Sequence, residues 1–452
     1  MIRTEKADVA VVGAGPAGLA AAAEAKNNGA PRVLVLERNP SWGGVLNQCI
    51  HDGFGLYRYG QELSGPEFAE LAALEAENSG AELRFCSTVT NISKNRELTV
   101  VSPQGLYKIQ AGAVVLASGC RERTRGNLMI PGDRPAGIFT AGTAQELINL
   151  RGLKIGTRGL ILGSGDIGLI VARRLTLMGI KVEAICEAGD HPTGLTRNIV
   201  QCARDFGIPI LTRTTVSNII GKDRLSAVEL SKTDDNMRPL EGSEKQLIPC
   251  DTLILSVGLI PERDLVSSFG ETEPDGTLKG ADGIFLCGNC KKIEQLADMA
   301  SLSGEAAGRL AAAFAAKKEA PSYQAFPPPK LPTGFPAENS VICTGCPRGC
   351  CVTLDKEGNA SGNFCPRGRV FALEESKDPK RYLTLSVASE CGKAVSLRSQ
   401  KPIPARLLLA EAKRLSSGIL PAEKAVLHGV CGLTAADAEL KVTGISPFDY
   451  LE

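Results

Sequence analysis

The chain has 452 residues, enough for two to four domains that each bury a core of their own. Its 51 basic and 50 acidic residues nearly cancel, so nothing in the composition favours nucleic acid or an anionic membrane surface as a partner. No apolar run is long enough for a transmembrane helix, and the charged start MIRTEK does not have the form of a signal peptide.

A glycine-rich turn follows the first predicted strand. Residues 8–12 (DVAVV) have the pattern of a buried parallel strand, and the text GAGPAG and the helical stretch LAAAAEAKNNG come next. Gly13 permits a tight turn, Gly15 lets the backbone approach a pyrophosphate, and Gly18 lets the helix pack close to the strand. The next strand, RVLVLE, ends at Glu37, which is placed to accept hydrogen bonds from ribose hydroxyls. The unit is typical of a dinucleotide-binding site with the phosphates at the helix N-terminus.

The same pattern recurs in GLILGSGDIGLIVARRLTLMGIKVEAICE. Its glycines are Gly163, Gly165 and Gly168, and the acidic residue is Glu187, again 24 positions after the first glycine. An acidic residue at this position favours NADH over NADPH because it repels a 2′-phosphate. Arg197 or Lys181 would weaken this preference if either lay nearby.

Three further apolar strands end in glycine turns. They are residues 111–119, ending in Ala117-Ser118-Gly119, residues 252–258, ending in Gly258, and residues 282–289, ending in Cys287-Gly288-Asn289. A helix is expected from about Gln295 to Ala316. Two dinucleotide units followed by such strands suggest FAD in one unit and a nicotinamide dinucleotide in the other.

Over residues 1–320 these motifs, in this order, resemble the pyridine nucleotide–disulfide oxidoreductase family. The resemblance implies an α/β enzyme with two Rossmann-like domains, in which an FAD domain (1–120 and 259–320) is split by an inserted NAD domain (121–258). The predicted FAD ligands are Gly13, Gly15, Pro16, Ala17, Gly18, Glu37, Arg38, Gly44, Val89, Ala117, Gly119, Gly288, Asn289 and Leu296. The predicted NAD ligands are Gly163, Gly165, Asp166, Ile167, Gly168, Glu187 and Gly258. The family has an aspartate where this chain has Asn289, which implies FAD binding with altered electrostatics.

Family members that reduce disulfides carry a cysteine pair after the second strand. Those two positions fall on Leu46 and His51 here, so the resemblance argues against a disulfide reductase. Cys49 and His51 remain near the expected flavin face, and residues two apart on an extended segment point the same way. We name them as candidate catalytic residues, a thiolate beside a histidine. The alternative is a packed cysteine and a histidine bonded to backbone. Cys287 and Cys290 also form a CxxC, which we interpret as core packing.

A second cysteine-rich motif follows residues 321–340, which we interpret as a proline-rich linker. Fifteen cysteines in a chain without a secretion signal suggest a cytoplasmic protein whose thiols are buried, catalytic or metal-bound. Four of them form a C-x2-C-x3-C group with one distant partner: Cys343, Cys346, Cys350 and Cys365. This spacing favours a 4Fe-4S cluster over zinc, although zinc and bare thiols stay open. Cys351, next to Cys350, is an alternative third ligand.

Residues 341–452 are expected to form a small α+β domain. The segments RYLTLSVAS and KAVSLRS alternate as a hairpin, and ARLLLAEAKRLSS has the pattern of an amphipathic helix. The stretches GGVLNQCIHDGFGLYRYGQELSGPEFA and CTGCPRGCCVTL resemble an accessory FAD-dependent oxidoreductase and a four-cysteine domain that accompany an anaerobic glycerol-3-phosphate dehydrogenase-like flavoprotein.

This resemblance implies an electron-transferring flavoenzyme that uses NAD(H), FAD and the four-cysteine centre, with that dehydrogenase as partner. The first alternative is a flavoprotein subunit of an amine- or opine-type oxidase or dehydrogenase, which the N-terminal part also resembles. A second alternative makes the cysteine domain a zinc-stabilised docking module. The sequence leaves a homo-oligomer open.

Overall fold

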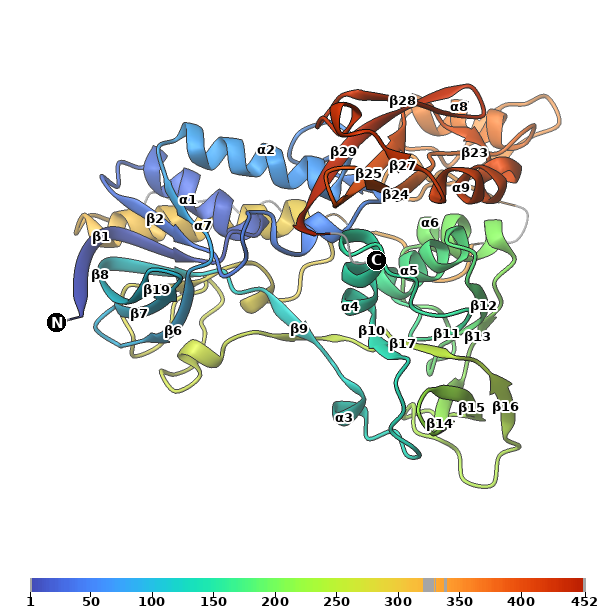
Figure 1. Ribbon diagram of the computed structural model, residues 1–452, viewed down its shortest axis with the longest axis horizontal. Helices are drawn as coiled ribbons and strands as arrows, with labels where there is room; N and C mark the ends of the chain where they lie inside the picture. The colour runs from blue at the N-terminus through green and yellow to red at the C-terminus, as the bar shows by residue number, and fades with distance from the viewer. Residues whose placement is uncertain (1, 320–328, 330, 337–339, 450–452) are drawn as a thin grey trace. The chain divides into compact units, whose positions relative to one another are not determined.

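The computed structural model describes residues 2–319, 329, 331–336 and 340–449 (Figure 1). Most of the predicted linker at 321–340 lies outside the described residues. Contacts divide the chain into two compact units. Unit 1 comprises Met1–Cys49, Phe54–Arg121 and Leu259–Pro328, and unit 2 comprises Ile50–Gly53, Glu122–Gly258 and Pro329–Glu452.

Unit 1 is built on a seven-stranded sheet that is parallel around its first strand. The strands are β5 (Glu82–Arg84), β2 (Val33–Leu36), β1 (Arg3–Val12), β8 (Gly105–Leu116), β7 (Glu97–Ser102) and β6 (Thr88–Ile92), with β19 (Ile284–Leu286) beside β8. Figure 1 shows α1 (Pro16–Asn27), α2 (Gly65–Asn78) and α7 (Ala297–Ala315) on one side of this sheet. The predicted strand at 8–12 is confirmed and starts earlier, at Arg3, because polar residues extend its pairing with β8.

Small residues let α1 and α7 approach each other at backbone distance. A Cβ placed on Gly304 of α7 would fall 2.0 Å from the Ala17 carbonyl oxygen, and one on Gly308 would fall 2.3 Å from that of Ala21. Side chains at these glycines would push α1 away from α7. The close contact holds α1, and therefore its N-terminus at the glycine turn, in a fixed position.

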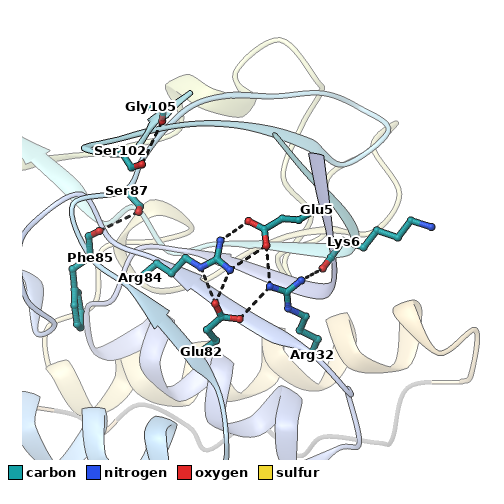
Figure 2. Close-up of polar contacts among 9 residues, drawn as sticks. All are labelled: Glu5, Lys6, Arg32, Glu82, Arg84, Phe85, Ser87, Ser102 and Gly105. Carbon is teal, nitrogen blue, oxygen red and sulfur yellow. Dashed lines mark hydrogen bonds and ion pairs between the residues drawn. The ribbon is translucent and has the colours of Figure 1, made fainter. Parts of the chain in front are cut away.

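Four charged side chains form an ion-pair network at the outer end of this sheet (Figure 2). Arg84 binds both Glu5 and Glu82, and Arg32 binds Glu5 at 2.9 Å and Glu82 at 3.2 Å. Hydrogen bonding by Arg84 and then Arg32 outweighs burial and lowers the pKa of Glu5 from 4.5 to about 2. The network ties β1 to β5 and to the chain entering β2.

We expect acid to remove the contribution of Glu5 to stability. Because its folded pKa is depressed, this contribution is present above pH 4.5 and is lost as the pH falls from about 4.5 towards 2. Glu5→Gln should cost about 1–2 kcal/mol of unfolding free energy at pH 7, and the difference from wild type should shrink steadily below pH 4.5. Urea unfolding between pH 7 and pH 3 measures this.

The matched control is Glu97→Gln, which breaks the more exposed pair with Lys108 and should cost less than about 0.5 kcal/mol. A cost for Glu5→Gln that stays constant down to pH 3 would contradict the assignment.

Unit 2 contains a five-stranded parallel sheet of its own. Its strands are β10 (Ile138–Thr140), β17 (Thr252–Leu255), β11 (Arg158–Leu162), β12 (Lys181–Cys186) and β13 (Ile210–Leu211). The helices of this part are α4 (Ala141–Gln145), α5 (Asp166–Leu177) and α6 (Thr196–Asn198). An antiparallel sheet follows, of β14 (Thr214–Gly221), β15 (Leu225–Lys232) and β16 (Gln246–Pro249). The expected mixed α/β fold with Rossmann-like sheets is confirmed.

The C-terminal residues of unit 2 form a second five-stranded sheet with one helix, α9 (Leu408–Ser416). Its strands are β27 (Ile419–Leu420), β24 (Thr384–Ser389), β25 (Lys393–Ser399), β29 (Ala438–Asp449) and β28 (Val430–Ala435). The predicted hairpin is β24 paired antiparallel with β25, and the predicted helix is α9. A cysteine module precedes them: β20 (Val341–Ile342), β21 (Cys351–Leu354), β22 (Ala360–Ser361) and α8 (Pro366–Glu375).

The remaining elements are short. They are β3 (Asp52–Phe54), β4 (Leu63–Ser64), β9 (Cys120–Glu122), α3 (Arg125–Leu128), β18 (Leu259–Pro261), β23 (Lys380–Arg381) and β26 (Ile403–Pro404). β9 and β18 pair where the chain leaves unit 1 and returns to it. No helix within the described residues has both the length and the apolar character that crossing a membrane requires.

Buried contacts join the C-terminal part to the parallel sheet within unit 2. Leu177, at the end of α5, lies in the apolar core of the C-terminal sheet. The Ser446 hydroxyl donates to the Leu150 carbonyl oxygen at 2.9 Å, and the Arg151 guanidinium lies 3.9 Å from the centre of the Phe448 ring. These contacts explain why residues 122–258 and the C-terminal residues fall into one unit.

Candidate functional site

The first glycine turn has no room for a side chain at Gly13 or Gly18 but is open at Gly15. Gly13 has φ +104°, and a Cβ there would fall 2.6 Å from the Ala117 carbonyl oxygen. A Cβ on Gly18 would fall 1.9 Å from the Gly13 oxygen, whereas one on Gly15 would meet nothing within 4 Å. Gly44 lies against the turn, since its Cβ would be 3.3 Å from the Gly15 Cα. The open position at Gly15, at the start of α1, fits the approach of a pyrophosphate.

Glu37 stabilises this turn by hydrogen bonds to its backbone. Its carboxylate is buried and accepts hydrogen bonds from the backbone N–H groups of Ala14 and Asn39, each at 2.8 Å. Each oxygen therefore keeps one further lone pair. Contact between Glu37 and a ribose stays a prediction, and the fixed carboxylate is compatible with it.

The second glycine turn repeats this geometry in unit 2. Gly163 has φ +103°, and its Cβ would fall 2.0 Å from the Ser256 carbonyl oxygen. A Cβ on Gly168 would fall 2.3 Å from the Gly163 oxygen, whereas one on Gly165 would meet only the Thr193 hydroxyl, at 3.9 Å. The open position is again the middle glycine, directly before α5.

Glu187 and Asp166 are the two acids of this turn, and both are engaged by the protein. Glu187 accepts from the backbone N–H of Ser164 at 3.2 Å and from that of Gly189 at 2.9 Å. One oxygen of Asp166 accepts from the Leu195 backbone N–H at 2.7 Å and from the Asn198 side chain at 2.8 Å, and burial raises the pKa of Asp166. They therefore tie the turn to β12 and to the chain entering α6.

Other predicted FAD residues gather at the carboxyl ends of β8 and β19. Gly288 has φ +59°, and a Cβ there would fall 2.7 Å from the Cβ of Ala17. The Asn289 side chain donates to the Cys120 sulfur at 3.6 Å and accepts from the Glu294 backbone N–H at 2.9 Å. Gly119 follows the end of β8 by three residues and has φ +74°, and a Cβ there would meet nothing within 4 Å.

The remaining predicted nucleotide residues have separate environments. Leu296 directly precedes α7, which begins two residues later than we predicted. Val89 is buried in the sheet core, and Arg38 is exposed. In unit 2, Ile167 packs on the core of the parallel sheet, and the Gly258 carbonyl accepts from the Arg123 backbone N–H at 3.1 Å.

Burial keeps both candidate catalytic residues neutral. The Cys49 thiol donates to the Val45 carbonyl oxygen at 3.3 Å, and burial raises its pKa to about 12. His51 Nδ1 lies 3.0 Å from the Asp52 carbonyl oxygen, and burial lowers the pKa of His51 to about 4. A thiolate–imidazolium pair is therefore disfavoured at neutral pH. The His51 contact is the backbone bond of our alternative interpretation, and the catalytic role stays a prediction.

Cys287 and Cys290 are packed inside unit 1. Both are fully buried, and burial raises the pKa of each thiol. The Cys290 sulfur donates to the Leu116 carbonyl oxygen at 3.0 Å. They are thiols that fill the end of the sheet core.

The four cysteines of the tail belong to one small module. The Cys343 backbone N–H donates to the Cys350 carbonyl oxygen at 2.9 Å, and Cys365 directly precedes the first residue of α8. Burial raises the pKa of Cys343, with smaller contributions from Cys346, Cys350 and Cys365, so the other three thiols lie near it. Among the described residues, no three His, Cys, Asp or Glu side chains are arranged to hold a metal ion.

Two positions near the predicted sites were not named as site residues from the sequence. Asp298, buried in the first turn of α7, accepts from the backbone N–H groups of Tyr57 at 3.1 Å and Arg58 at 3.0 Å. It thereby fixes the loop after β3. In the sequence, Asp298 stands out only as an acidic residue at the start of an alanine-rich helix. The other is Arg197, which the sequence presents only as a candidate 2′-phosphate ligand. Lys181, the other candidate for that role, binds Glu183 at 3.0 Å.

Residues 7–304 match the pyridine nucleotide-disulphide oxidoreductase family. An opine oxidase subunit of Agrobacterium tumefaciens (strain Ach5) is 26% identical over 68% of this chain and 64% of that protein. The alpha subunit of sarcosine oxidase from Corynebacterium sp. (strain U-96) is 31% identical over 56% of this chain and 26% of that protein. Hydrogen cyanide synthase subunit HcnB of Pseudomonas protegens is 25% identical, covering 68% of each chain. The chain thus spans less than two thirds of the first two relatives.

Solved structures show the same fold. Thioredoxin reductase of Lactococcus lactis covers 69% of this chain and 99% of its own, with a TM-score of 0.54 and 21% identity. Thioredoxin reductase of T. acidophilum covers 68% and 98%, with a TM-score of 0.53 and 21% identity. With two glycine turns of matching geometry and a family match over most of its length, the chain belongs to the pyridine nucleotide-disulphide oxidoreductase family and is an FAD-dependent oxidoreductase that uses a nicotinamide dinucleotide.

Proposed function

We propose that this chain is an NADH-linked flavoenzyme that passes electrons between nicotinamide, flavin and a metal centre in its cysteine module, for a partner dehydrogenase. The observation that carries this proposal is the repeated glycine turn. Gly15 and Gly165 leave the backbone open in the same way, each directly before a helix. The cysteine module also belongs to the same compact unit as the second turn.

In this proposal the chain's own residues bind and orient two dinucleotides. The free N–H groups at the starts of α1 and α5 face the phosphates, and Glu37 and Glu187 accept from the ribose hydroxyls. Glu187 favours NADH because a 2′-phosphate beside a carboxylate is repelled. When both cofactors are bound, they supply hydride transfer, which depends on the positions in which the protein holds them.

Cys343, Cys346, Cys350 and Cys365 would hold the metal centre. Thiolates bind either an iron–sulfur cluster or zinc, and the compact C-x2-C-x3-C spacing in the sequence favours a 4Fe-4S cluster. Such a cluster supplies one-electron transfer, which is useful beside a two-electron flavin. Zinc would supply only structure, and the module would then serve for docking.

The proposed partner is a glycerol-3-phosphate dehydrogenase-like flavoprotein, by the resemblance of the cysteine segments. A second candidate is a flavoprotein subunit of an amine- or opine-type oxidase or dehydrogenase. It is favoured by the curated relatives, which are named as subunits of opine oxidase, sarcosine oxidase and hydrogen cyanide synthase. Rapid anaerobic reduction of the flavin by an amino acid such as sarcosine, without NADH, would select this second candidate.

Anaerobic titration with NADH tests the first proposal. We expect NADH to bleach the flavin absorbance and then a broad cluster absorbance, with about four iron and four sulfide per chain. Cys343→Ser should lose the iron, the sulfide and the broad absorbance, while NADH still reduces the flavin.

Cys391→Ser, which changes an exposed cysteine of the same unit, is the control and should keep the iron. Cys351→Ser separates the two candidates for the third ligand. Stoichiometric zinc without iron would contradict the electron-transfer role and select the docking module. Iron retained in Cys343→Ser would contradict the ligand assignment.

A further inference from the structure

Among the described residues, the side chain of Arg197 is buried without a hydrogen-bond or ion-pair partner. It belongs to α6 in unit 2 and is 4% exposed. Its Nε is buried and has no hydrogen-bond partner, and no ion pair to its guanidinium is found within the part of the chain that the structure describes. Arginine cannot shed its proton in a protein, so a buried and unpaired guanidinium is costly. Such a group is the expected signature of a site for an anion.

The guanidinium points at a glycine in the segment Ile50–Gly53, which belongs to the same unit. Gly53 has φ +110°, and a Cβ there would fall 3.2 Å from Arg197 Nη1 and 3.4 Å from Nη2. Because Gly53 has no side chain, its backbone lies close to the guanidinium without a clash. Arg197 therefore faces the backbone two residues after the candidate residue His51.

Charges of both signs lie around this segment. Asp52 lies 2.9 Å from Arg398, so its charge is already paired. Arg173 donates to the Tyr382 carbonyl oxygen at 2.9 Å, and its charge also interacts with that of Asp205. Burial is the main cause of the lowered pKa of His51, and the charges of Arg173 and Arg197 add to it, so His51 contributes no charge of its own at neutral pH.

The nearest acid on the other side of Arg197 is Asp166. Its charge interacts with that of Arg197, but its Oδ1 accepts from Leu195 and Asn198 rather than from the guanidinium. Asp166 therefore offsets part of the charge and leaves the donors of Arg197 unused.

The backbone of Arg197 is held from two directions. The Thr196 N–H donates to the Pro332 carbonyl oxygen at 3.1 Å, and a Cβ on Gly349 would lie 3.6 Å from the Arg197 nitrogen. The Gly194 N–H donates to the Ser164 carbonyl oxygen at 3.0 Å, which ties this loop to the second glycine turn. The backbone that carries the guanidinium is thus fixed in place, which lowers the entropic cost of binding.

We propose that Arg197 binds the oxyanion of a small molecule, a carboxylate or a phosphate, beside Gly53. Planar guanidinium groups suit both anions because two parallel N–H groups meet two oxygens. The anion has two possible sources. One is the nicotinamide dinucleotide, whose phosphates bind at the adjacent glycine turn, and the other is an acidic substrate. The second source rests on the proposed function, whereas anion binding itself does not.

The test compares Arg197→Gln, Arg197→Lys and wild type as oxidised holoprotein without NADH. Thermal unfolding and flavin absorbance are followed during titration with inorganic phosphate and with acetate. We expect wild type to gain stability with either anion, and Arg197→Gln to bind about 10- to 100-fold more weakly, with Arg197→Lys between them. Without anion, Arg197→Gln should unfold at a higher temperature than wild type because an unpaired buried charge is removed. Arg204→Gln, seven residues along and exposed, is the control and should match wild type throughout.

Two further measurements identify the source. A raised Kd for NADH in Arg197→Gln, with phosphate competing against NADH, assigns the site to the dinucleotide. An unchanged Kd for NADH, with acetate still binding in its presence, assigns it to an acidic substrate. Equal anion binding by wild type and Arg197→Gln would overturn the proposal. So would a lower unfolding temperature of Arg197→Gln without anion, since the guanidinium would then have an internal partner.

Discussion

Gly165→Val is expected to raise the Kd for NADH at least about 100-fold while the protein keeps its fold and its FAD. Gly165 has φ −65° and ψ 168°, a conformation that valine adopts without strain. Its Cβ would meet only the Thr193 hydroxyl at 3.9 Å, so the protein itself has room for it. The added methyl groups occupy the approach of the pyrophosphate instead, and a loss of about 2.7 kcal/mol of binding corresponds to the stated factor.

Equilibrium binding of NADH to the oxidised protein and the stoichiometry of FAD measure this outcome. Gly15→Val is the reciprocal control, because Gly15 is equally open in unit 1 and its replacement should remove FAD instead. Gly163→Ala should damage the fold, since its φ is +103° and its Cβ would fall 2.0 Å from a carbonyl oxygen. An unchanged Kd for NADH in Gly165→Val would show that the dinucleotide binds elsewhere.

Arg381→Met should cost about 3–5 kcal/mol of the unfolding free energy of unit 2. Arg381 is 5% exposed and lies 2.7 Å from Asp205 and 2.6 Å from Glu375. Methionine would leave two largely buried carboxylates, 13% and 16% exposed, close together without a cation, which is a costly change in a protein interior. Burial already raises the pKa of Asp205, and loss of Arg381 would raise it further. The same change removes the ion pair between Arg381 and Glu375, the last residue of α8, and Cys365 directly precedes this helix.

Urea unfolding followed by circular dichroism measures this cost. The control is Arg406→Met, which breaks an exposed pair with Asp378 and should cost less than about 1 kcal/mol. Arg381→Met combined with Asp205→Leu and Glu375→Leu should recover much of the loss, since no buried charge then remains. A cost below about 1 kcal/mol for Arg381→Met alone would mean that the three side chains separate in solution.

Much of the nucleotide-binding architecture could be predicted because it is encoded over short distances along the chain. Each strand, glycine turn and helix occupies about 25 residues, and the need for a positive φ at Gly13 and Gly163 is a property of the local backbone. The spacing to Glu37 and Glu187 follows from the length of one helix and one strand. The C-terminal hairpin and α9 are likewise encoded in local periodicity.

The chemical state of the candidate residues could not be predicted in the same way. The spacing of Cys49 and His51 suggested a reactive pair, but the pKa of each depends on burial by distant segments. The four tail cysteines were recognised from spacing alone, and their common module comes from pairing of β20 with β21 and packing of α8.

The sequence alone therefore determined the two dinucleotide units and the class of enzyme, since both depend on motifs that are contiguous in the chain. Tertiary structure decided that Arg197 faces Gly53, that Arg381 joins Asp205 to Glu375, and that Ile50–Gly53 belongs to unit 2. Each of these contacts joins residues far apart in sequence. No local pattern specifies such a contact, because it exists only after the intervening chain has packed.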